Sequence, residues 1–234
     1  MKPLFLLMPG ILNDAELWSE VLHWLGPEAE ARVADLGQDA TIAAMAERAW
    51  AQLADVPPER PVVLAGFSLG GYVALEMLAR PQRPVKAAVL VSTSAQLETP
   101  ESAAARAKTL RAFERDFPRT VDGIAQWASH QPSEALLQRL RHMMLRVGPE
   151  AATRQNLAAG QRTDHRAALA QLKLPVTVLC GLQDRITTPA QAQDLAALIP
   201  GATLEWVPEV GHMLPLEQPE PVARALARWL DASV

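Results

Sequence analysis

Ser68 lies between two glycines, in the run Gly66-Phe67-Ser68-Leu69-Gly70, directly behind the apolar run Pro61–Ala65. A buried strand that leads into Gly-x-Ser-x-Gly predicts a sharp turn into a helix, a nucleophile elbow, because a Cβ at either glycine would collide with neighbouring backbone. The turn exposes the serine hydroxyl where the N–H groups of the next helix, expected at 71–78, favour negative charge. These residues predict a serine nucleophile.

A histidine is needed beside this serine, because a hydroxyl is a poor nucleophile near neutral pH until a base takes its proton. Of the five histidines, His212 follows the last expected strand and precedes the final helix, in the loop Val210–Pro215. A loop in that position faces the same edge of the sheet as Ser68. His23 falls within a helical pattern, and the other three lie in residues 95–166, expected to form a cap: His130, His142 and His165. We therefore expect His212 to be the base.

An acidic side chain must then orient the imidazole and stabilise its charged form. Asp184 follows the expected strand Val176–Cys180 directly, again at the carboxyl end of a strand. Asp164 is the fallback, at the end of an expected helix, and Asp194 is a weaker candidate because it lies within one. We expect Asp184 to be the acid that orients His212.

Two backbone N–H groups are expected to form an oxyanion hole, which stabilises the charge that develops on a substrate carbonyl. One is the N–H of Leu69, directly after the nucleophile. The other should come from the loop Met8–Asp14, which follows the first expected strand. We expect Ile11 to supply it, with Leu12 as the second choice.

Short apolar runs separated by helical patterns predict the elements that position these residues. The runs are Leu4–Met8, Arg32–Leu36, Val62–Phe67, Ala87–Ser92, Val176–Cys180 and Ala202–Val207. They are continuous rather than alternating, which indicates strands buried on both faces of a parallel sheet. We therefore expect an α/β fold, a doubly wound and mainly parallel sheet of about six strands with right-handed crossovers.

Residues 95–166 break this rhythm, because they contain helical periodicity and no strand-like run. Helices are expected at 100–117, 119–129, 133–147 and 149–163. We expect a helical cap, inserted after the fourth strand into a core made of residues 1–94 and 167–234. Substrate contacts are expected from Phe113, Phe117, Trp127 and Met143 of the cap and from Leu12 and Met213 of the core; simple helix packing is the alternative explanation for the cap residues.

Composition excludes several other classes of protein. The 234 residues carry a net charge of −4 and no basic stripe with interleaved aromatics, which disfavours nucleic-acid binding. The single Cys180 rules out an internal disulfide framework and lies in an apolar run, where we read it as a buried hydrophobe. The sequence predicts no membrane span or signal peptide, no metal site and no organic cofactor. We expect a cytoplasmic protein that binds a small-molecule substrate.

The chain resembles the α/β-hydrolase superfamily, in particular its small capped esterases, thioesterases and carbon–carbon hydrolases. The resemblance rests on the elbow, on the order Ser68, Asp184, His212, on the loop from Pro9 to Trp18, and on Gly211-His212. Two features depart from the family pattern. Pro9-Gly10 replaces the usual His-Gly, and only Met1 to Pro3 precede the first strand, so the family's N-terminal hairpin is not expected. A serine at position 68 argues against the branches that use an aspartate nucleophile.

The resemblance implies acyl transfer on a small carboxylic ester or thioester, in which Ser68 attacks the carbonyl and His212 shuttles the proton. A second hypothesis uses the same three residues for carbon–carbon hydrolysis, or for a lyase reaction like that of the menaquinone-pathway members. A pocket for an anionic substrate, built from Arg111, Arg115 or Arg146, would favour this second hypothesis. A third hypothesis is a ligand-binding protein with a vestigial triad.

Overall fold

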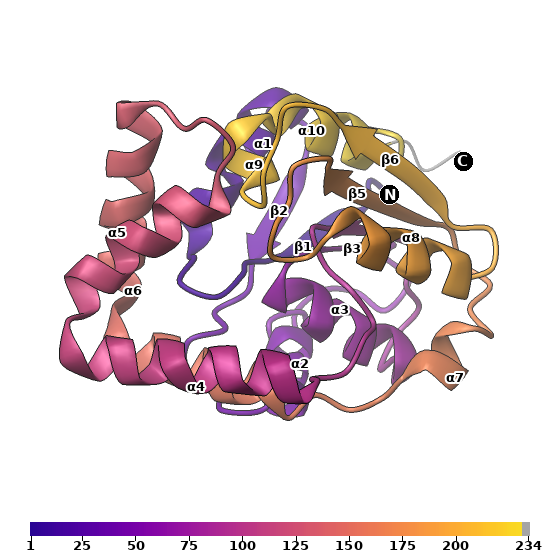
Figure 1. The fold of residues 1–234 in the computed structure, drawn as a ribbon. Coiled ribbons are helices and arrows are strands. Elements are labelled where there is room, and N and C mark those ends of the chain that lie inside the picture. Colours follow the sequence, from indigo (N-terminus) through magenta and orange to yellow (C-terminus); the bar gives the residue numbers. More distant parts are fainter. Residues whose placement is uncertain (231–234) are drawn as a thin grey trace.

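The computed structural model describes residues 1–230, which form an open sheet flanked by helices (Figure 1). Within that range the sheet has six strands in the order β2-β1-β3-β4-β5-β6, and every neighbouring pair is parallel. The strands are β1 (Leu4–Met8), β2 (Glu30–Val33), β3 (Val62–Phe67), β4 (Ala87–Val91), β5 (Val176–Gly181) and β6 (Thr203–Val207). The predicted doubly wound α/β fold is confirmed.

Helices cover both faces of this sheet (Figure 1). One face packs against η1 (Ala15–Trp18), α1 (Ser19–Leu25), α9 (Leu214–Glu217) and α10 (Pro219–Ala227). The other packs against α2 (Ile42–Ala51), α3 (Leu69–Ala79), α7 (Arg166–Leu169) and α8 (Pro189–Leu198). The apolar cores on the two faces explain why the strands are continuously hydrophobic.

Strand β1 illustrates how one apolar run serves both cores. Phe5 and Leu7 point to the face of α1 and α10, whereas Leu4, Leu6 and Met8 point to the face of α2 and α3. All five side chains are fully buried. Each contributes about 1.5–3 kcal/mol through removal from water, so the strand is held from both sides.

From β1 the sheet continues to β2 on one side and to β3 on the other. The parallel strands β1 and β3 are therefore neighbours in the sheet although β2 separates them in sequence. In open α/β sheets, ligands bind beyond the carboxyl ends of the strands where the order of the strands reverses in this way. The loop after β1 and the turn after β3, which contains Ser68, both lie there. Topology alone therefore brings together the expected nucleophile and the expected oxyanion loop.

Between β4 and β5 the chain forms helices that lie to one side of the sheet (Figure 1). They are α4 (Pro100–Arg115), α5 (Phe117–Ala128) and α6 (Glu134–Gly160). The side chains of Thr99, Asp116 and Ser133 each accept a backbone N–H in the first turn of these helices. Helix α6 bends at Gly148, whose φ is 80°, just before Pro149. The two helices expected at 133–147 and 149–163 are the halves of α6.

The predicted position of the second strand was wrong by two to three residues. The sequence suggested Arg32–Leu36, but β2 covers Glu30–Val33. This strand lies at the edge of the sheet and is only partly buried. Its limits are therefore set by its pairing with β1, from Glu30 with Leu4 to Val33 with Leu7, and not by the positions of its apolar residues. The other strands begin and end within one residue of their predicted bounds.

None of the helices described in residues 1–230 combines the length and apolar character needed to cross a bilayer. Over the same residues, no group of three or more His, Cys, Asp or Glu side chains is arranged to hold a metal ion.

Candidate active site

Ser68 stands at the turn between β3 and α3, with φ 52° and ψ −113°. A Cβ on Gly66 would lie 2.4 Å from the carbonyl oxygen of Gly70, and a Cβ on Gly70 would lie 2.0 Å from that of Met8. Real Cβ atoms do not approach backbone so closely, so only glycine fits at these two positions. The backbone thus forms the sharp strand-to-helix turn that the sequence predicts.

The end of β4 holds this turn in place. The N–H of Ser68 donates to the carbonyl of Val91 over 3.0 Å, and the hydroxyl of Thr93 donates to the carbonyl of Ser68 over 2.9 Å. Thr93 is almost fully buried. Thr93 could not be identified from the sequence, because a threonine just after a strand carries no signal of a contact made 25 residues away along the chain.

His212 lies between the other two predicted residues. Its Nε2 is 3.0 Å from the Oγ of Ser68, and its Nδ1 is 2.9 Å from the Oδ2 of Asp184. The imidazole is only 5% exposed, and its ring centre is 5.0 Å from that of Phe67. The structure therefore brings Ser68, His212 and Asp184, residues far apart in sequence, into one hydrogen-bonded cluster, called here the Ser68 cluster.

Asp184 is fixed by its own loop as well as by His212. Its Oδ1 accepts the N–H groups of Ile186 and Thr187 over 2.8 and 3.0 Å, and its Oδ2 accepts the Thr187 hydroxyl over 2.9 Å. Burial by itself raises the pKa of Asp184, but the charge and hydrogen bond of His212, with the loop donors, outweigh burial and hold the pKa below its usual value. The carboxylate thus stays ionised while it faces the imidazole.

Thr187 contacts both Asp184 and His212. Its Oγ1 is also 3.2 Å from the Nδ1 of His212, and the residue is 4% exposed. Thr187 was not among the residues predicted from the sequence. A signal did exist, because an aspartate followed two and three residues later by N–H groups it can accept is a typical local turn.

The alternative acids make other contacts. The exposed Asp164 forms an ion pair with Arg166 at 2.6 Å, and that guanidinium holds the pKa of Asp164 at about 2. Asp194 accepts a hydrogen bond from the side chain of Gln96. The carboxylate beside His212 in the structure is Asp184.

The loop after β1 makes a tight turn against the elbow. The N–H of Asn13 donates to the carbonyl of Gly10 over 3.2 Å, and Leu12 in this turn has a φ of 63°. The N–H of Leu12 donates to the side-chain carbonyl of Gln155, from α6, over 2.9 Å. Leu12, the second choice for an oxyanion donor, has therefore already used its N–H. Gln155 was not anticipated, because a glutamine inside a predicted helix has no distinguishing pattern.

Five of the six predicted substrate contacts lie together in the core on the α1 and α10 side: Leu12, Phe113, Phe117, Met143 and Met213. The rings of Phe113 and Phe117 meet edge to face, 5.2 Å apart. Trp127 lies elsewhere. Its side chain is 56% exposed, and the guanidinium of Arg185 stacks 4.4 Å from its ring centre. Trp127 is therefore not part of the apolar cluster that borders Leu12.

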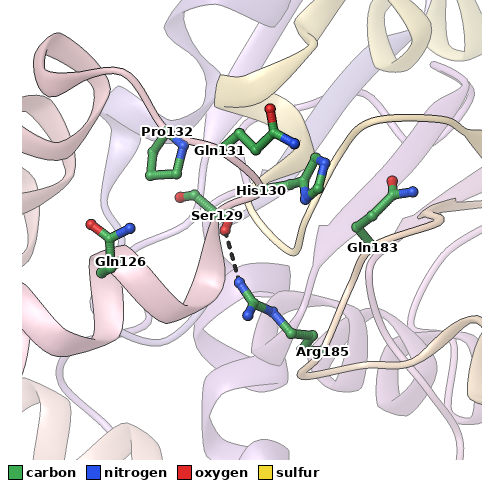
Figure 2. Close-up of a pocket in the computed structure, with 7 residues that line it drawn as sticks. All are labelled: Gln126, Ser129, His130, Gln131, Pro132, Gln183 and Arg185. Carbon is green, nitrogen blue, oxygen red and sulfur yellow. Dashed lines mark hydrogen bonds between the residues drawn. The ribbon is translucent and has the colours of Figure 1, made fainter.

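Figure 2 shows a surface pocket of about 510 Å³ beside the loop that carries Asp184. Its lining residues are Gln126, Ser129, His130, Gln131, Pro132, Gln183 and Arg185. Arg185 donates to the carbonyl of Ser129 over 3.2 Å. Because Gln183 and Arg185 flank Asp184, this contact ties the acid's loop to the end of α5. Ser68 and His212 are not part of this pocket.

The end of α5 also holds the loop of the histidine. The N–H of His212 donates to the carbonyl of Ala128 over 2.6 Å. The carboxylate of Glu217 accepts the N–H groups of His130 and Gly211 over 2.7 and 3.1 Å. Burial raises the pKa of Glu217, partly offset by these donors. The inserted helices thus help to set the position of His212.

The geometry of the Ser68 cluster allows base-assisted attack by a serine. An imidazole at hydrogen-bond distance from a hydroxyl can take its proton, and a carboxylate on the other ring nitrogen stabilises the resulting charge. Cys180, in contrast, is fully buried, and burial raises the pKa of its thiol to about 12. A thiol in that state is not the nucleophile, in agreement with its reading as a buried hydrophobe.

Comparison with known proteins agrees with this geometry. The model of the alpha/beta hydrolase family matches residues 5–225, and the chain therefore belongs to that family. This membership identifies the chain as a hydrolase, and proteins to which it is similar are named esterases. A thermophilic esterase from Thermogutta terrifontis shares the fold with a TM-score of 0.85 and 25% identity, over 98% of this chain and 89% of that one.

Its curated relatives include several pimeloyl-acyl-carrier-protein methyl ester esterases. The one from Aromatoleum aromaticum is 30% identical in an alignment that covers 95% of this chain and 96% of that protein. The one from Neisseria meningitidis serogroup A is 29% identical in an alignment that covers 76% of this chain but only 58% of that protein's length.

Proposed function

We propose that this protein hydrolyses carboxylic esters of a small acyl substrate, with Ser68 as nucleophile, His212 as general base and acid, and Asp184 as the acid that orients His212. The observation that carries the proposal is the pair of contacts of His212, 3.0 Å to the Ser68 hydroxyl and 2.9 Å to the Asp184 carboxylate. The membership of the family and the esterases among the relatives support it.

In the first half of the reaction, the Ser68 oxygen attacks the ester carbonyl carbon while the Nε2 of His212 takes the hydroxyl proton. The carbonyl oxygen becomes an oxyanion, for which we propose the N–H groups of Leu69 and Ile11 as donors. The first-turn N–H of Leu69 has no acceptor within its helix, and beside Ile11 the N–H groups of Leu12 and Asn13 are already bonded. When the C–O bond breaks, His212 returns the proton to the leaving alcohol.

In the second half, water attacks the Ser68 ester and gives one proton to His212. The carbon–oxygen bond to Ser68 breaks, the acid leaves, and the proton returns to the Ser68 oxygen. Throughout, the ionised Asp184 stabilises the imidazolium. Each oxyanion donor contributes roughly 3–4 kcal/mol to lowering the barrier.

The names of the relatives support a methyl ester of an acyl chain as the substrate class. The buried apolar cluster from α4, α5 and α6 that borders Leu12 suits such a chain. We also propose that residues 95–166 act as a cap, since the end of α5 contacts the His212 loop directly.

The arginines offer little support for the carbon–carbon hydrolase or lyase hypothesis. Arg146 is paired with Asp14 and Glu16 at 2.7 and 2.6 Å, and Arg111 and Arg115 are exposed on α4. None of them is an unpaired positive charge in a buried anion-binding pocket. The intact contacts of His212 likewise give no support to a vestigial site.

The test is hydrolysis of methyl and p-nitrophenyl esters of short and medium-chain acids, with matched thioesters, by the wild type and by Ser68→Ala. We expect ester hydrolysis that falls by at least about 10⁴-fold in Ser68→Ala, because members of such a cluster act as a unit. Ser94→Ala, in the segment that follows β4, is the control and should keep full activity. A Ser68→Ala protein that keeps its activity would refute the mechanism.

A further inference from the structure

The turn that contains Ile11 holds the next residue, Leu12, in an unfavourable backbone conformation. Leu12 is the third residue of the turn closed by Asn13 and Gly10, and its φ is 63°. Turns of this kind favour glycine at the third position, and another residue there costs about 1–2 kcal/mol. Rotation of the Ile11–Leu12 peptide would give Leu12 a negative φ and remove that cost. The turn therefore needs an outside contact to stay as it is.

Gln155 provides such a contact, at both ends of its side chain. Its Oε1 accepts the N–H of Leu12 over 2.9 Å, and its Nε2 donates to the carbonyl of Leu36 over 3.4 Å. The side chain is 1% exposed, so water does not compete for these groups. Gln155 thereby bridges the loops that follow β1 and β2.

Helix α6 aims Gln155 at this point. The helix bends at Gly148, and its second half lies against the loop after β2, where Arg154 donates to the carbonyl of Gly37 over 2.8 Å. Leu36, the partner of Gln155, is the residue before Gly37. Two consecutive side chains of α6 thus contact consecutive carbonyls, but Gln155 also contacts the turn next to the elbow.

We propose that Gln155 is a positioning residue for the oxyanion hole, an inference that rests on the proposed function. It bonds the peptide that directly follows the Ile11 N–H and keeps that peptide from rotating. Rotation would exchange the places of the Leu12 N–H and the Ile11 carbonyl, and would redirect the buried Leu12 side chain. The hydrogen bonds of the Gln155 side chain go to Leu12 and Leu36 rather than to Ser68 or His212, so Gln155 acts through the turn.

The test compares Gln155→Met with Arg154→Met. Both substitutions keep an unbranched side chain and remove a hydrogen bond from α6 to the loop after β2, but only the first frees the Leu12 N–H. We expect Gln155→Met to lower kcat by about tenfold to a hundredfold with KM changed less than about threefold, since a misplaced oxyanion donor weakens transition-state binding. Arg154→Met should leave kcat within about threefold. Equal effects of the two variants on kcat would overturn the proposal.

Exchange of the Leu12 amide, followed by NMR, gives a readout that does not require turnover. Gln155→Met should speed this exchange, and Arg154→Met should not; an unchanged Leu12 amide in Gln155→Met would overturn the proposal. Gln155→Ala, which only removes atoms, replaces Gln155→Met if that protein does not fold. A wild type that hydrolyses no ester would refute the proposed function, while the Leu12 amide would still decide whether Gln155 holds the turn.

Discussion

At the scale of single residues, the roles proposed for Ser68, His212 and Asp184 depend on neighbours that perform no chemistry themselves. The N–H groups of Ile186 and Thr187 donate to Oδ1 of Asp184, and the Thr187 hydroxyl donates to Oδ2, the oxygen that also contacts His212. They favour the ionised carboxylate against the cost of its burial, and they leave it in one orientation. The charge that stabilises the imidazolium is therefore in place before any substrate binds.

This arrangement predicts a large effect of Asp184→Asn. The amide would keep the shape of the side chain but would lose the negative charge and favour the wrong tautomer of His212, so we expect kcat to fall by about 10⁴-fold. Asp164→Asn is the matched control, because the exposed Asp164 accepts hydrogen bonds from the backbone N–H and the guanidinium of Arg166. Steady-state kinetics would decide. Full activity of Asp184→Asn, or a loss confined to Asp164→Asn, would move the orienting role to Asp164.

At the scale of elements, the elbow depends on close packing between β3, α3 and the loop after β1. The missing Cβ at Gly70 lets α3 begin directly against the carbonyls of Met8 and Pro9. This contact brings the oxyanion loop beside Ser68. A change at Gly70 should therefore affect the whole site, unlike a change at a glycine that merely lies in a helix.

Gly70→Ala and Gly123→Ala should have opposite effects on stability. A Cβ at Gly70 would lie 2.0 Å from the carbonyl of Met8, whereas one at Gly123, inside α5, would meet nothing within 4 Å. We expect Gly123→Ala to stabilise the protein by about 0.5–1 kcal/mol, because alanine favours a helix over glycine. Gly70→Ala should unfold at lower denaturant concentration or fail to fold. Chemical denaturation measures both, and a stable Gly70→Ala protein would contradict the packing described here.

The elements that the sequence predicts well are those whose own residues carry the signal. Buried strands are continuous apolar runs, and the Gly-x-Ser-x-Gly turn is local, so β3 and Ser68 could be located without the structure. The edge strand β2 could not, because its limits are set by pairing with β1. Gln155, Thr93 and Glu217 were missed for a related reason: their contacts join segments that only the folded chain brings together. Trp127 has an apolar side chain but lies at the surface, stacked against Arg185.

At the scale of the whole molecule, the inserted helices are fastened to the core at two places. Arg139 pairs with Glu16 and Glu20, and Arg146 pairs with Asp14 and Glu16, at the end of the loop after β1. At the other place, the carbonyl of Ala128 accepts the N–H of His212. Partly exposed ion pairs contribute little stability each, so we regard these contacts mainly as fixing where α5 and α6 lie. The insertion is thus part of the scaffold that positions the Ser68 cluster.

Labelling of the purified protein with a fluorophosphonate probe, followed by mapping of the modified residue, tests whether His212 activates Ser68. We expect stoichiometric modification of Ser68, because a hydroxyl 3.0 Å from an imidazole is activated for attack on phosphorus. The labelling should be lost in His212→Ala and retained in His142→Ala, a control on α6. Modification of another residue, or labelling of Ser68 that survives His212→Ala, would show that His212 does not activate Ser68.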